Sequence, residues 1–207
     1  MRCSGKLTRL LVAILVVSPL SALYPQVDSR ELEEGQEPVT FLNYEGPQSR
    51  IETRAQIRGI GYALGVAVRA GAVAPGDTAR YFVIHSVSDP EGTKLDADIL
   101  GLGTAAAVDH IRNLRLIIQG YLEGAYDYGE QDAALLARYI TIYNAVFRGN
   151  WNFFTSRYKT PVINNLTREN AGLSTRYDEW PGRSLIVIPL QTALAGSLSA
   201  IDTSTLT

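Results

Sequence analysis

The stretch from Thr104 to Tyr126 places the strongest constraint on the fold, because it has the clearest helical period in the chain. Its apolar residues recur at intervals of three and four and would form one stripe on an α-helix. The stripe consists of Ala107, Ile111, Leu114, Ile118, Leu122 and Ala125. Leu116 lies among the polar residues of the opposite arc, so we expect the back of the helix to be covered too. The pattern predicts a central helix, with Thr104 as its N-cap.

Other segments supply the remaining secondary structure. Strand-like composition occurs at residues 39–44, 80–87 and 184–189. A helix is predicted over residues 49–70, where Ser49 and Glu52 have the spacing of a capping box, and another from about Glu130 to Phe147. The order β-α-β-α-α-β predicts an α+β fold, in which a small sheet of about three strands is covered by amphipathic helices.

Three glycines, Gly59, Gly61 and Gly65, lie inside the first predicted helix. Their spacing departs from the dinucleotide-binding pattern G-x-G-x-x-G by one residue, and they follow a helix start instead of a strand. We therefore expect no nucleotide site and no cofactor. The small residues should instead let this helix approach a neighbouring element closely.

The two ends of the chain differ in composition from its middle. Residues 1–22 have the basic start, short apolar run and small final residues of a secretory signal peptide, and the run ends at Pro19 before it could cross a bilayer of about 30 Å. Residues 23–38 are acidic and aperiodic, which predicts a flexible arm. We expect one globular domain over residues 39–190, and a polar tail or the start of a linker over residues 191–207.

Charge and cysteine content exclude several classes of function. The chain has 19 Lys and Arg against 21 Asp and Glu, and removal of the leader takes away three basic residues and no acidic ones. Nucleic acid is not an expected partner, because phosphate binding requires a basic surface. The single cysteine, Cys3, lies in the leader, so we expect no disulfide and no thiol chemistry in the mature protein.

The segment VDHIRNLRLIIQGYL at residues 108–122 resembles the spirochaete antigens of 83/100 kilodaltons, a family found in Borrelia and in treponemes. Further matching stretches are FLNYEGP at 41–47, LDADI at 95–99, YNAVFRG at 143–149, LIVIPL at 185–190 and GSLSAID at 196–202. The resemblance covers about residues 39–203, the N-terminal domain of the family. It implies an exported protein of the periplasm or cell envelope with no assigned enzymatic activity, and it supplies no catalytic residues. Members of the family continue into a long charged helical region, so this chain is expected to be a truncated or incomplete member.

One set of residues could bind a metal ion: His85, His110, Asp96 and Asp98, with Asp89 and Asp109 beside them. No H-x₃-H or comparable pair places two ligands on one face, so such a site would depend wholly on tertiary contacts. We expect His110 to be a hydrogen-bonded helix residue and His85 a strand residue. Ser86 and Ser88 lie near His85 but lack the nucleophile elbow of a serine hydrolase.

Two arginines of the central stretch, Arg112 and Arg115, are candidates for binding a partner. Arg115 is also expected to pair with Asp96 or Asp98, because it lies at the edge of the apolar stripe. The favoured interpretation is a non-enzymatic interaction or structural module that contacts an envelope protein. Membrane association is compatible with it, although no transmembrane helix is expected in the mature chain. The alternative is a metal-assisted envelope enzyme that uses the two histidines and the nearby aspartates.

Overall fold

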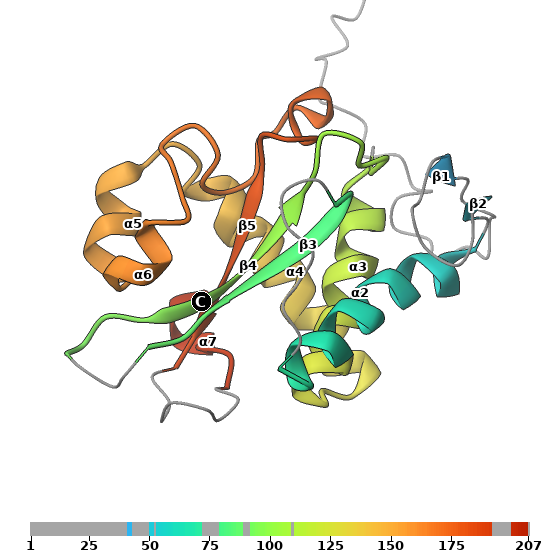
Figure 1. Cartoon of the computed structure of the whole chain (residues 1–207), viewed down its shortest axis with the longest axis horizontal. Helices are drawn as coiled ribbons and strands as arrows, with labels where there is room; N and C mark the ends of the chain where they lie inside the picture. Colours follow the sequence, from blue (N-terminus) through green and yellow to red (C-terminus); the bar gives the residue numbers. More distant parts are fainter. Residues whose placement is uncertain are drawn as a thin grey trace, which may run out of the picture. The chain divides into compact units, whose positions relative to one another are not determined.

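The computed structural model describes residues 41–42, 50–51, 53–71, 79–88, 92–108, 110–191 and 200–206. Residues 35–207 form one compact unit that is distinct from residues 1–34. The predicted signal peptide and acidic arm lie outside the described residues. The elements in chain order are β1 (Phe41–Leu42), β2 (Arg50–Ile51), α2 (Arg54–Arg69), β3 (Tyr81–Ser86), β4 (Asp96–Leu102), α3 (Ile111–Tyr126), α4 (Glu130–Val146), α5 (Trp151–Arg157), α6 (Thr160–Ile163), the 3-10 helix η1 (Tyr177–Glu179), β5 (Leu185–Leu190) and α7 (Thr203–Leu206) (Figure 1).

The main sheet is antiparallel and has the order β3-β4-β5, which confirms an α+β fold with a small three-stranded sheet. Its central strand, β4, was not predicted as a strand. Asp96 and Asp98 interrupt the apolar pattern of this strand, although all of its residues are buried. The strand predicted at residues 39–44 contributes only Phe41–Leu42, which pairs with β2 in a separate two-stranded sheet.

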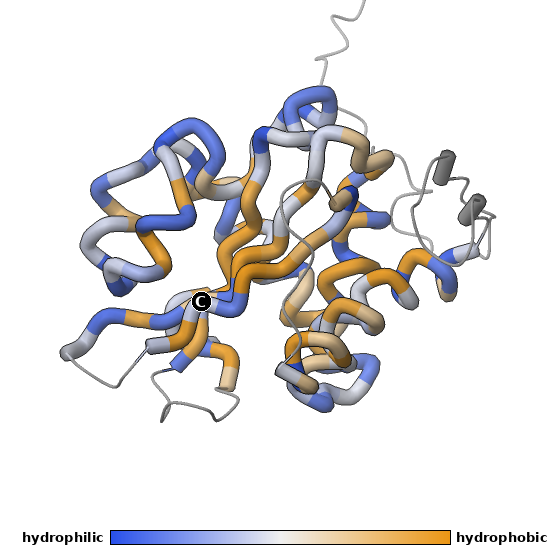
Figure 2. Tube along the Cα trace, in the orientation of Figure 1, coloured by the Kyte–Doolittle hydropathy of each residue, from blue (hydrophilic) through white to orange (hydrophobic). Residues whose placement is uncertain are grey.

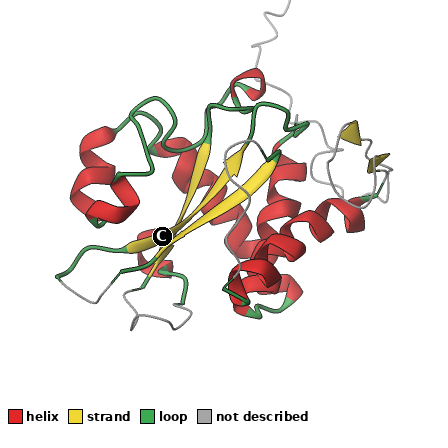
Figure 3. Ribbon diagram, viewed as in Figure 1, coloured by secondary structure: helices red, strands yellow, loops and turns green. Residues whose placement is uncertain are grey.

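Both faces of the main sheet are buried. Figure 2 shows apolar residues concentrated along its three strands, and Figure 3 shows helices on both sides. The face beneath α2 and α3 contributes Tyr81, Val83, Leu100, Leu102, Ile186 and Ile188 to the larger core cluster. The opposite face places Ala97, Ile99 and Val187 against Phe154, Tyr158 and Val162. Phe154 and Tyr158 are fully buried in this second cluster.

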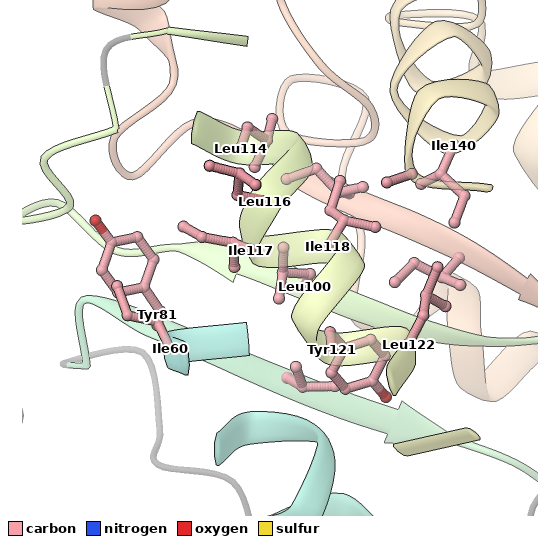
Figure 4. Close-up of a cluster of buried hydrophobic side chains, with 14 of the residues drawn as sticks. Ile60, Tyr81, Leu100, Leu114, Leu116, Ile117, Ile118, Tyr121, Leu122 and Ile140 are labelled. Carbon is pink, nitrogen blue, oxygen red and sulfur yellow. The ribbon is translucent and has the colours of Figure 1, made fainter. Parts of the chain in front are cut away.

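Helix α3 is central, as predicted. Its predicted stripe residues Leu114, Ile118 and Leu122 are fully buried, and Leu116 on the other arc is buried too (Figure 4). The predicted start was wrong, because Thr104 lies in a turn and the helix begins at Ile111. His110 provides the N-cap instead, since its Nδ1 accepts a hydrogen bond from the backbone N–H of Arg112 at 3.1 Å.

Helix α2 also begins later than predicted. Its capping box is formed by Thr53 and Gln56, whose side chains each accept a hydrogen bond from the other's backbone N–H. Arg50 and Ile51 are therefore free to form strand β2, and the predicted capping residues Ser49 and Glu52 lie outside the described residues. The sequence contains two pairs of this spacing, and the second one caps the helix.

The close approach predicted for the glycines of α2 is confirmed, and it is reciprocal. A Cβ atom on Gly61 would lie 1.8 Å from the carbonyl oxygen of Ile117 in α3. A Cβ atom on Gly120 of α3 would lie 1.9 Å from the carbonyl oxygen of Arg58 in α2. Gly65 and Gly124, one turn further along each helix, are also confined, because a Cβ there would lie 2.5 Å and 2.4 Å from backbone atoms of the other helix. The two helices thus pack backbone against backbone through one G-x-x-x-G pair each.

Helix α4 protects the outer edge of β5. The Asn144 side chain accepts a hydrogen bond from the backbone N–H of Val187 and donates one to its carbonyl oxygen, each at 2.8 Å. The side chain thereby satisfies the backbone of Val187 in the middle of this edge. An exposed edge would otherwise offer unpaired backbone groups to other chains.

Residues 200–206 pack against β5, although residues 191–207 were expected to form a polar tail or linker. Ile201 is buried and bridges to Leu190, and Asp202 donates its backbone N–H to the carbonyl oxygen of Pro189 at 2.9 Å. Asp202 then accepts hydrogen bonds from Ser204 and Thr205 at the start of α7. The folded unit therefore extends beyond residue 190.

Candidate functional site

A buried polar centre surrounds Asp98 on the middle strand. His85, directly opposite on β3, shares a hydrogen bond between its Nδ1 and Asp98 Oδ1 at 2.6 Å. The hydroxyls of Tyr121 and Tyr126, from the second half of α3, both donate to Asp98 Oδ2. Asp98 is fully buried and His85 is partly exposed. A buried carboxylate thus joins the sheet to α3 and fixes the orientation of a histidine ring at the surface.

Asp98 and burial together shift the pKa values of the three side chains that contact this carboxyl group. Its hydrogen bond raises the pKa of His85, an effect that burial partly opposes. Burial, reinforced by the nearby carboxylate, raises the pKa of Tyr121 and of Tyr126. Both tyrosines therefore stay protonated and act as donors at physiological pH, while His85 gains positive charge more readily than a free imidazole.

The second aspartate of β4 forms a buried ion pair. Lys159 Nζ lies 2.9 Å from Asp96 Oδ2, and both side chains are almost fully buried. The backbone N–H of Ser88 donates to Asp96 Oδ1 at 3.1 Å, and Lys159 also donates to the carbonyl oxygen of Ser88. Leu95 adds two backbone hydrogen bonds with the chain around Tyr158. These contacts hold the α5–α6 region against the sheet, so the Asp96–Lys159 pair has a structural role.

The structure separates the residues proposed for a metal site. His85 contacts Asp98, which is also bonded to Tyr121. Tyr121 lies three turns along α3 from His110, the N-cap of the helix. The backbones of His110 and Tyr121 are roughly 16 Å apart along the helix axis at 1.5 Å per residue, whereas metal–ligand bonds are about 2 Å. Among the described residues, no group of three or more His, Cys, Asp or Glu side chains is arranged to hold a metal ion. Asp96 is occupied by Lys159, and Asp89 and Asp109 lie outside the described residues.

The candidate arginines of α3 are partly buried near its first turns. Arg115 Nε donates to Thr141 Oγ1 of α4 at 3.0 Å, and Thr141 in turn donates to the carbonyl oxygen of Arg138. Arg115 therefore links α3 to α4, and the predicted partners Asp96 and Asp98 are bonded to other side chains.

The outer face of α4 carries an exposed apolar stripe. The stripe consists of Leu135, Tyr139, Ile142 and Val146, with exposures of 49%, 38%, 52% and 68%. Tyr139 and Val146 recur at helical intervals with the inward-facing residues of α4, but they face outward. The core-facing side is formed by a different set that includes Leu136, Ile140 and Tyr143.

The sequence contained a signal for this surface. Leu135 and Leu136 are adjacent, and so are Tyr139 and Ile140, and each pair spans about 100° of the helix circumference. A helix with two adjacent apolar stripes needs cover on both sides or presents one of them to a partner. Asn144 and the neighbouring sheet fix which side of α4 faces inward.

Comparison with known proteins gives one match. The family model described as Borrelia P83/100 protein matches residues 29–207. No curated protein and no solved structure matches this chain. Within the described part of the chain, no helix combines the length and the apolar character that crossing a membrane requires.

Proposed function

The chain belongs to the Borrelia P83/100 protein family, and we propose that it is an exported cell-envelope antigen that acts as a non-enzymatic interaction module. It binds another envelope protein through the outer face of α4. The family resemblance supports the location, and the exposed apolar stripe supports the mode of action.

The observation that carries this proposal is the exposure of four large apolar side chains in one row on a well-packed helix. Folding does not require Ile142 and Val146 to be apolar, because more than half of each side chain is exposed to solvent. Contiguous exposed apolar surface on a soluble domain is typical of a protein–protein contact. The opposite side of the same helix is fixed by the core and by Asn144, so the surface is held rigidly for binding.

The test is the native size of the protein in detergent-free envelope extracts of spirochaete cells, measured by size-exclusion chromatography. The wild-type chain should elute in an assembly larger than the monomer. The double variant Ile142→Gln, Val146→Gln should elute as a monomer. The matched control Tyr62→Gln, Val66→Gln removes two similarly exposed apolar residues from α2 and should behave as wild type.

Two results would contradict the proposal. Elution of the wild-type chain as a monomer would show that no stable complex exists. Equal assembly in all three proteins would show that the partner binds elsewhere. Unchanged thermal unfolding of both double variants is the control that separates lost binding from lost folding.

A further inference from the structure

We infer that the outer face of α4 binds an amphipathic helix of another protein. The apolar side of that helix packs on the stripe, and an acidic side chain next to its apolar side pairs with Arg138. The inference rests on the proposed function, because it names the kind of partner that the same surface takes.

The spacing of the stripe indicates a helical partner. Leu135, Tyr139, Ile142 and Val146 are separated by four, three and four residues, which is the a/d repeat of a helix that packs along another helix. The twelve residues from Leu135 to Val146 are joined by eleven helical steps and extend about 16 Å along the axis. A second helix crossing at a small angle covers such a row along its whole length.

The residues on either side of the stripe limit its width. Leu136 and Tyr143 on one side face the domain core. On the other side Arg138 is exposed, and Ala134 and Ala145 are half-buried. A charged residue directly beside the seam argues against insertion into a bilayer, where an unpaired arginine is costly.

The charge of Arg138 beside the stripe indicates which charge the partner carries. Arg138 has no ion pair with the residues that the structure describes. The other charge exposed on this face, Asp132, lies in the first turn of α4, where the helix dipole stabilises it. Arg138 is thus the charge that remains to be matched, and a carboxylate on the docked helix would match it.

A second copy of this chain does not meet that requirement. The residues of α4 that occupy the same side of the seam one heptad before and after Arg138 are Gln131 and Ala145. Two copies of α4 therefore offer Arg138 no carboxylate along this flank. Asp132 of an antiparallel copy meets Arg138 only in a register that leaves Ile142 and Val146 beyond the start of the partner's α4 at Glu130. The partner helix comes from a different sequence.

The test uses the purified chain and two synthetic helices about three heptads long, which is enough for helix formation. Both probes carry leucine at the seam positions, and one has glutamate at the flanking positions where the other has lysine. Binding is measured by fluorescence anisotropy at low salt, where screening is weak. The wild-type chain should bind the glutamate probe about fivefold more tightly, as expected for exchanging a surface attraction for a repulsion.

Three variants complete the design. Arg138→Glu should reverse the preference, so that the lysine probe binds more tightly. Ile142→Gln should weaken both probes, and the control Tyr62→Gln should bind as wild type. Reversal of the preference identifies Arg138 as the recognition residue, because a merely structural arginine would not exchange specificity.

The possible failures are distinguishable. Equal binding of both probes by wild type, with a loss in Ile142→Gln, would refute the acidic partner and leave the docking surface intact. If wild type binds neither probe while the envelope assembly still depends on Ile142 and Val146, the helical partner is refuted and the proposed function stands. Self-association of the chain that disappears in Ile142→Gln would replace the acidic helix with a second copy.

Discussion

The replacement Gly61→Ala should destabilise the protein through a single methyl group. The new Cβ would lie 1.8 Å from the Ile117 carbonyl oxygen and 2.7 Å from the Tyr121 backbone nitrogen. Both are backbone atoms of a rigid, buried helix, so neither can rotate away. Non-bonded heavy atoms in proteins essentially never approach a Cβ within 3.0 Å, so α2 and α3 would have to separate by more than 1 Å.

The magnitude follows from two opposing effects. Overpacking of a well-packed core costs about 1–3 kcal/mol, and the upper end applies here because two helix backbones must move. Alanine is favoured over glycine inside a helix by about 1 kcal/mol. We therefore expect Gly61→Ala to lower the free energy of unfolding by about 2 kcal/mol.

Gly59 supplies a matched control two residues away in the same helix. No atom lies within 4 Å of a Cβ built there, so Gly59→Ala should gain helix propensity without a clash and raise stability by about 0.5–1 kcal/mol. Urea unfolding followed by circular dichroism gives both values. A Gly61→Ala protein as stable as Gly59→Ala would refute the backbone-to-backbone packing of the two helices.

Two further predictions concern the buried polar groups of β4. Lys159→Met should cost about 3–5 kcal/mol, because it leaves Asp96 as a buried charge without its cation, whereas Arg176→Met at an exposed ion pair should leave the urea midpoint unchanged. His85 has a raised pKa in the folded state, so its pairing with Asp98 stabilises the fold fully below the unfolded-state value of about 6.5 and loses that effect as the pH rises through the folded-state pKa. The stability difference between wild type and His85→Gln should accordingly be larger at about pH 5.5 than at about pH 8.5, and a difference independent of pH would contradict this assignment.

The sequence predicts those parts of the fold that depend on local periodicity. The central position of α3 and the close packing at Gly61 follow from the spacing of apolar and small residues, and both are confirmed. The helix starts were less predictable, because Thr104 and His110 both precede apolar residues and tertiary packing selects the second.

Strand β4 and the α4 surface escaped prediction for a different reason. Asp96 and Asp98 made the β4 sequence too polar to be recognised as a buried strand. The burial of these two aspartates is favourable only because Lys159, His85 and the two tyrosines of α3 bond to them. On α4, apolar residues occupy two adjacent stripes, and their periodicity alone cannot tell which stripe faces the core. Both cases depend on contacts between residues far apart in the chain.

The most direct test of the account compares the free energies of unfolding of Ile140→Gln and Ile142→Gln, two residues apart on α4. Ile140 is fully buried, so its replacement should cost several kcal/mol, because a large polar group enters the core. Ile142 is 52% exposed on the proposed docking surface, and its replacement should change stability by no more than about 0.5 kcal/mol. Similar losses in the two variants would mean that the outer stripe serves folding, and would contradict its assignment as a surface held free for a partner.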